Sequence, residues 1–203
     1  MQTSQIEALD DESTGTRVVF EWCGDRFRHS IFAVRLGEAS LLAESLEGDS
    51  TDIWPTSPPL QQLHKQPSPT GRDMLLLTGM AGKSHWSGSI TTSTDLRWTQ
   101  LGFAFACRYR NSPEWMGVTY RIADNIHFDR NLNAFHLNDE LQYELYPSAI
   151  GTSLATENIV TSTIDVTDRT IRITAKETPH LTTATTNQWA YEIRLTRPYW
   201  LVK

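Results

Sequence analysis

Three arginines carry the clearest binding chemistry in this sequence. Strand alternation over residues 101–110 places Arg108 and Arg110 on one face, beside small alanines that would leave room above a sheet. If residues 117–122 return as the second strand of a hairpin, Arg121 joins the same face. Because a guanidinium presents several N–H donors in a planar fork, this face predicts a site for a carboxylate, phosphate or other anion. The alternative is that these arginines pair with the chain's own acids on an ordinary solvated face.

Two of the seven tryptophans are candidates for ligand binding. Trp115 falls in the loop beyond the arginine strand, and Trp86 directly follows His85. Indole rings stack on sugar rings and on protein partners, although they also cap the ends of a β-sandwich core. The predicted ligand-binding residues are therefore Arg108, Arg110, Arg121, Trp115, His85 and Trp86.

The Gly82-Lys83-Ser84 segment invites comparison with a phosphate-binding loop, but its context differs. Leu77 stands where such a loop has its first glycine, and His85-Trp86 is a poor start for the helix that must follow. The segment therefore predicts a glycine turn between two strands.

Metal and nucleophile chemistry have weaker support. Alternation would place His127 and Asp129 on one face with His136 nearby, but no His or Cys spacing matches a zinc pattern. Neither cysteine nor any serine sits in a nucleophile motif. The sequence predicts no metal, no cofactor and no identifiable catalytic residue. An enzyme remains an alternative if the fold brings His85 or His127 to a carboxylate.

Composition limits the classes of partner. The 203 residues carry a formal net charge of −6, which argues against a general nucleic-acid binder. The longest apolar runs are far shorter than the roughly 20 residues that span a bilayer. The amino terminus has neither the basic nor the apolar region of a secretion signal, so we expect a cytoplasmic chain without a membrane partner. For Cys23 and Cys107 we expect buried thiols, with a disulfide as the alternative in an oxidising compartment.

Hydrophobic periodicity predicts an all-β domain. Alternating segments recur at hairpin-like spacing and suggest about ten strands, one or two short helices, and an antiparallel β-sandwich (jelly-roll-like) or barrel. Residues 1–16 are expected to form a flexible acidic arm, and residues 17–203 a single β domain.

Particular elements can be placed along this domain. Residues 16–36 predict a hairpin about Gly24-Asp25, with a bulge near Ser30 and Ile31 where the apolar face changes. Helical spacing over residues 38–47 and a Ser57-Pro58 start suggest the two short helices. Residues 101–110 and 117–122 are expected to pair with each other.

The leading hypothesis is a non-catalytic module that binds a small polar or anionic ligand or a carbohydrate. The alternatives are an enzyme with a His/carboxylate site assembled by the fold, and a structural or protein-interaction subunit. A homo-oligomer is open in each case.

Overall fold

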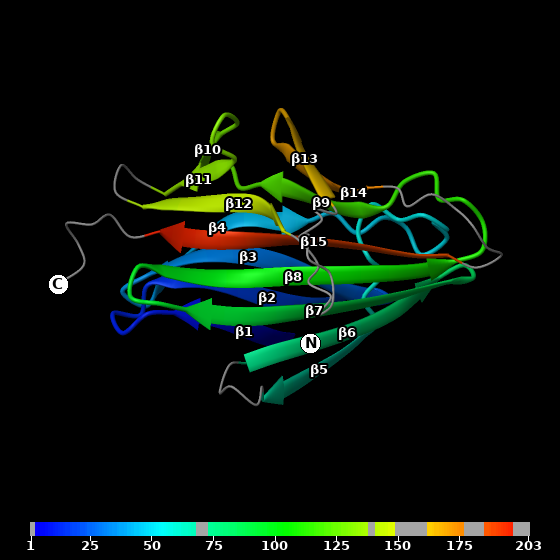
Figure 1. Cartoon of the computed structure of the whole chain (residues 1–203), viewed down its shortest axis with the longest axis horizontal. Helices are drawn as coiled ribbons and strands as arrows, with labels where there is room; N and C mark the ends of the chain where they lie inside the picture. The colour runs from blue at the N-terminus through cyan, green and yellow to red at the C-terminus, as the bar shows by residue number, and fades with distance from the viewer. Residues whose placement is uncertain (1–2, 68–72, 138–140, 149–161, 177–184, 197–203) are drawn as a thin grey trace, which may run out of the picture.

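The structure is a computed structural model that describes residues 3–67, 73–137, 141–148, 162–176 and 185–196. Within these ranges the chain forms fifteen strands and no helix. The strands make two antiparallel sheets that pack face to face (Figure 1). The predicted β-sandwich is therefore confirmed, and the sheets do not close into a barrel. No helix in the described part of the chain is long and apolar enough to cross a membrane.

Sheet A has seven strands in the order β1-β2-β3-β4-β9-β14-β13. Their bounds are β1 Thr3–Leu9, β2 Gly15–Cys23, β3 Arg26–Arg35, β4 Glu38–Ser45, β9 Gly117–Ile122, β14 Thr170–Ala175 and β13 Ser162–Thr167.

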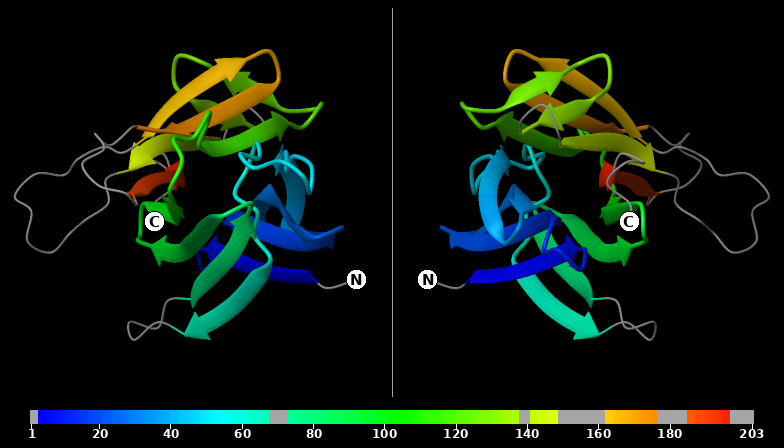
Figure 2. Two further views of the ribbon diagram at one scale, coloured as in Figure 1. Left: turned by 90° about the vertical axis from the view of Figure 1, so that its right-hand side faces the viewer. Right: turned by 90° about the vertical axis from the view of Figure 1, so that its left-hand side faces the viewer.

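Sheet B has eight strands in the order β10-β11-β12-β15-β8-β7-β6-β5. Their bounds are β10 His127–Asp129, β11 Ala134–His136, β12 Gln142–Ser148, β15 Thr185–Thr196, β8 Trp98–Tyr109, β7 Ser84–Thr94, β6 Asp73–Ala81 and β5 Gln62–Pro67. Figure 2 shows β1–β4 and β7, β8 and β15 in opposite layers.

The core lies between the sheets and is filled by every second residue of the long strands. On β8 the inward residues are Phe103, Phe105, Cys107 and Tyr109, and on β15 they are Trp189, Tyr191, Ile193 and Leu195. Both sets match the alternation expected from the sequence. Phe103 stacks on Tyr191 with ring centroids 4.6 Å apart. These central strands therefore project their even-numbered side chains, including Arg108, from the outer face of sheet B.

Three expectations about individual elements are wrong. Residues 3–9 are not a loose arm, because they form β1 and pair with β2 along its whole length. Residues 38–45 form β4 rather than a helix, because pairing with β3 and β9 satisfies their backbone in an extended conformation. The residues after Ser57 also form no helix. Leu60 N–H instead bonds the Pro58 carbonyl, and β5 begins at Gln62.

The expected hairpin between residues 101–110 and 117–122 is also wrong. β8 lies in sheet B between β7 and β15, whereas β9 lies in sheet A between β4 and β14. The loop between them crosses from one sheet to the other, so Phe105 pairs with Trp189 and Gly88 rather than Ile122.

Other local predictions are confirmed. β2 and β3 form a hairpin about Gly24, whose φ of 71° suits glycine. The register between β3 and β4 shifts between Ile31 and Phe32, close to the expected bulge. The additional residue, Leu42, belongs to β4. Gly82, with a φ of 54°, lies in the turn that joins β6 to β7, so the predicted glycine turn is confirmed.

Candidate functional site

The outer face of sheet B carries a row of side chains near the turn between β6 and β7. Met80 pairs with His85, and His85 pairs with Arg108, so these residues are neighbours on three adjacent strands. All three are exposed. Neighbouring strands are about 4.8 Å apart, so the row extends over about 10 Å. It places an apolar, an imidazole and a guanidinium group side by side.

A depression of about 400 Å³ opens beside this row, and we call it the cationic depression. Its lining residues come from the β6–β7 turn and from the end of β8: Met80, Gly82, Lys83, His85, Arg108, Tyr109 and Arg110. It therefore combines one lysine, two arginines and a histidine. Arg108, Arg110 and His85 from the predicted set meet here, and Lys83 joins them.

Lys83, Arg108 and Arg110 have no carboxylate within ion-pair distance among the residues that the structure describes. Carboxylates contact several other cations of the chain: Arg17, Arg26, Arg28, Lys65, Arg169 and Arg194. Arg121 and Arg172 on sheet A also have no such partner among the described residues, but they do not line the cationic depression. In a chain with a net charge of −6, three adjacent unpaired cations make a local positive field. This arrangement disfavours the alternative that Arg108 and Arg110 simply pair with the chain's own acids.

A second depression of about 400 Å³ adjoins the first and shares Met80 and His85 with it. We call it the polar depression, because its other side chains include amides and hydroxyls. Its lining residues are Gln61, Gln62, Thr78, Gly79, Met80, His85, Trp86 and Ser87. Trp86 itself is only 2% exposed, because its indole points into the core, where it packs edge-on against Trp189.

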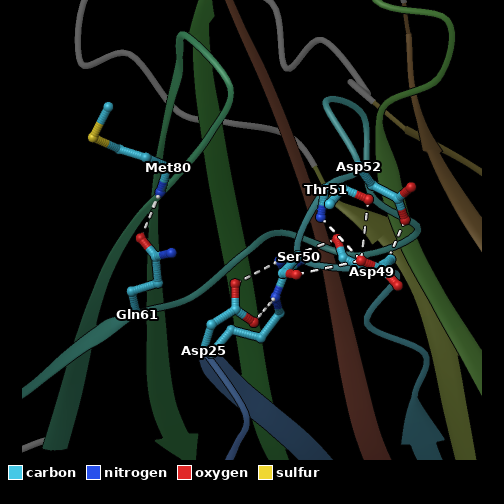
Figure 3. A network of polar contacts seen from close by, with 8 residues as sticks. Asp25, Asp49, Ser50, Thr51, Asp52, Gln61 and Met80 are labelled. Carbon is cyan, nitrogen blue, oxygen red and sulfur yellow. Dashed lines mark hydrogen bonds and ion pairs between the residues drawn. The ribbon is translucent and has the colours of Figure 1, made fainter.

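The end of the segment between β4 and β5 forms one side of the polar depression. The Gln61 amide oxygen accepts a 3.0 Å hydrogen bond from Met80 N–H (Figure 3), and Gln61 N–H donates to the Thr78 carbonyl. This segment lies so close to β6 that a Cβ on Gly79 would be 1.6 Å from the Pro59 carbonyl oxygen. Glycine is therefore required there, and it fixes the position of Met80.

An aspartate-rich turn lies earlier in the same connection, at residues 49–52. Asp49 accepts hydrogen bonds from Thr51, and its own N–H donates to Asp52 (Figure 3). Arg26 pairs with Asp25 and also donates to the Asp49 carbonyl. These contacts anchor the connection to β3 before it reaches the polar depression.

Two predicted site residues lie elsewhere. Arg121 is on β9, in register with Glu44 and Thr170, on the outer face of sheet A. It is therefore on the opposite sheet from Arg108, and the expected grouping of the two is wrong. Trp115 lines a third depression of about 300 Å³ beyond Tyr109, where the Arg172 guanidinium lies 4.9 Å from its ring centroid.

A buried polar chain that the sequence reading missed joins the two sheets. His29 Nε2 lies 2.7 Å from Tyr120 Oη, and Tyr120 Oη lies 2.5 Å from Tyr191 Oη. On the other side of the ring, His29 Nδ1 is 3.9 Å from a Glu47 carboxylate oxygen that also accepts from Ser45 Oγ. An inward-facing histidine on the Phe27/His29/Ile31 face was the only sequence signal, since the tyrosines come from distant strands.

Burial favours the uncharged forms of the residues in this chain. It lowers the pKa of His29 to about 3 and raises the pKa of Glu47 to about 7. It also raises the pKa values of Tyr120 and Tyr191 above their ordinary range. His29 is 1% exposed, and neither His29 nor Glu47 lines the depressions above. The chain therefore connects the two sheets through their shared interior.

The histidines of the enzyme hypothesis are not assembled with acids. His85 is exposed beside cations, and His127 faces His136 across β10 and β11 with ring centroids 5.7 Å apart. Within the described ranges, neither His85 nor His127 forms an ion pair with a carboxylate. No group of three or more His, Cys, Asp and Glu side chains in those ranges could hold a metal ion.

Comparison with known proteins gives no match: no family model, no curated protein and no solved structure is significantly similar to this chain.

Proposed function

We propose that this chain is a non-catalytic binding module whose cationic depression holds the acidic group of a small polar ligand. The observation that carries the proposal is the convergence of Lys83, Arg108 and Arg110 without acidic partners among the described residues. Unpaired cations that line a concave surface attract an anion, and a guanidinium can bind a carboxylate or phosphate through two parallel hydrogen bonds.

The shape of the surface supports a ligand of modest size. A volume of about 400 Å³ lies at the small end of typical ligand sites. The depression is open, and its cations are exposed, so salt will screen the attraction. Binding should therefore weaken as ionic strength rises.

The proposal can be tested by isothermal titration calorimetry with inorganic phosphate and with galacturonate as probes, at low and at high salt. Hydrogen bonds to charged groups contribute about 1.5–3 kcal/mol, so R108A should weaken binding of a bound probe by about tenfold or more. R121A is the matched control, because Arg121 is an exposed arginine on the opposite sheet. Binding that R108A leaves unchanged, or that R121A weakens equally, would contradict this placement.

The remaining expectations stay predictions. Cys23 and Cys107 are both free thiols, which supports a cytoplasmic location, but only Cys107 is buried and the expectation of a buried Cys23 is wrong. The absence of nucleic-acid and membrane partners also remains a prediction of the sequence.

A further inference from the structure

We infer that the ligand is an acidic oligosaccharide that occupies both depressions, with a carboxylate on the cations and the hydroxyls of neighbouring sugar residues on the amides and hydroxyls. This inference rests on the proposed function and extends it, because it names the class of ligand and adds the polar depression to the site.

The continuity of the two depressions is the first support. They share Met80 and His85, and each has a volume of about 400 Å³. One inorganic oxyanion would occupy only part of the cationic depression. The combined surface suits a longer molecule.

The register of sheet B gives the direction in which such a molecule would extend. Gln62, Thr78 and Ser87 are partners on β5, β6 and β7, one row away from Met80 and His85. Side chains on one face of a strand repeat about every 7 Å, since each residue advances about 3.3 Å. The two rows are therefore separated by a distance on the scale of one sugar residue.

The chemistry changes between the two depressions. Charged residues dominate the cationic depression, whereas Gln62, Thr78 and Ser87 are neutral groups that can both donate and accept hydrogen bonds. Such groups match sugar hydroxyls and offer no charge for a second phosphate. Met80, which is 47% exposed, offers an apolar surface at the junction for the C–H face of a sugar ring.

Two other classes of ligand fit less well. A nucleotide base needs an exposed aromatic face, and the only indole in the polar depression, Trp86, is 2% exposed. An acidic peptide that binds as an added strand would pair with the nearer free edge of this sheet, which is β5, and β6 and β7 separate that edge from Arg108 on β8.

The test compares galacturonate, its linear tetramer and neutral maltotetraose by isothermal titration calorimetry on the full chain. We expect the acidic tetramer to bind at least about tenfold more tightly than galacturonate, and maltotetraose to bind at least about tenfold more weakly than the acidic tetramer. In the Q62A/S87A variant the ratio of the tetramer affinity to the galacturonate affinity should fall toward one. T91A is the control, because Thr91 is an exposed hydroxyl on the same strand that lines neither depression.

The possible results separate this inference from the proposed function. If galacturonate binds and R108A weakens it, but the tetramer gains nothing, the inference fails and the proposed function stands. If phosphate binds while all three sugars do not, the inference fails in the same way. If phosphate and the acidic sugars all fail to bind, both proposals fall.

Discussion

Glu47 provides a test of how the buried polar chain contributes to stability. Burial raises the pKa of Glu47 from its ordinary value of 4.5 to about 7 in the folded chain. Below pH 4.5 the carboxyl is protonated in both the folded and the unfolded chain, and stability is unaffected. As pH rises from 4.5 to 7, the unfolded chain ionises first, so stability falls and then stays at the lower level.

The size of this loss follows from the two pKa values. One pKa unit corresponds to about 1.4 kcal/mol, so a difference of about 2.5 gives a loss of about 3 kcal/mol. This is an upper figure, because the Glu47 side chain remains 11% exposed and water can reach it. Replacement of Glu47 by glutamine keeps an oxygen that can accept from Ser45 Oγ and removes the ionisation.

His29 contributes with the opposite sign. Because burial lowers its pKa from 6.5 to about 3, stability is lost as pH falls below 6.5. Between pH 4.5 and 6.5 the stability change from Glu47 and the stability change from His29 have opposite signs and offset each other. The pH profile of the wild type alone would therefore reveal neither contribution. The measurement is therefore the difference in unfolding free energy between E47Q and the wild type, from urea unfolding at pH 4.5 to 8.

We expect this difference to grow with pH by up to about 3 kcal/mol in favour of E47Q. E44Q is the control, because Glu44 is a partly exposed carboxylate paired with Arg28, and its effect should stay within about 0.5 kcal/mol. A pH-independent difference would refute the reasoning. A difference that grows in favour of the wild type would show instead that Glu47 is ionised and stabilised by Arg26.

Two further predictions concern backbone packing and thiol accessibility. Gly79→Ala should destabilise the chain by more than about 2 kcal/mol in urea unfolding, because the added Cβ would lie 1.6 Å from the Pro59 carbonyl oxygen. If the variant is as stable as the wild type, Gly79 and Pro59 are not in such close contact. Cys23 is exposed and Cys107 is buried, with burial raising the pKa of Cys107 to about 12. A thiol reagent should therefore modify Cys23 quickly in the folded chain and Cys107 only on unfolding, and equal rates would contradict this difference.

The local sequence pattern was sufficient to predict much of the architecture. The alternation along β8 and β15 predicted which side chains face the core, because successive residues of a strand point to opposite faces. Local reasoning failed for residues 38–47, where Ala39, Leu42 and Leu46 match helical spacing although residues 38–45 form β4. β4 pairs with its sequence neighbour β3 and with the distant β9, and this pairing on both sides outweighs the local preference.

The candidate site shows the same division. Arg108 and Arg110 could be placed on one face from residue order alone, and the glycine turn beside Lys83 could also be predicted. Arg108 lies beside His85 because β7 pairs with β8. Arg121 lies on the other sheet because the loop between β8 and β9 crosses between the sheets. The first arrangement is a hairpin between consecutive strands, and the meeting of Arg108 with His85 depends on its register. The second arrangement leaves no local signal, because the strands that pair with β9 are far from it along the chain.

Residue order by itself determined that this chain forms strands, which of their faces are apolar, and where glycine turns divide them, since these properties depend on neighbours along the chain. Only the tertiary structure decided which cations share a depression and which histidine lies beside a buried carboxylate. Those relations depend on the order of strands in two sheets, which is set by the packing of one shared core.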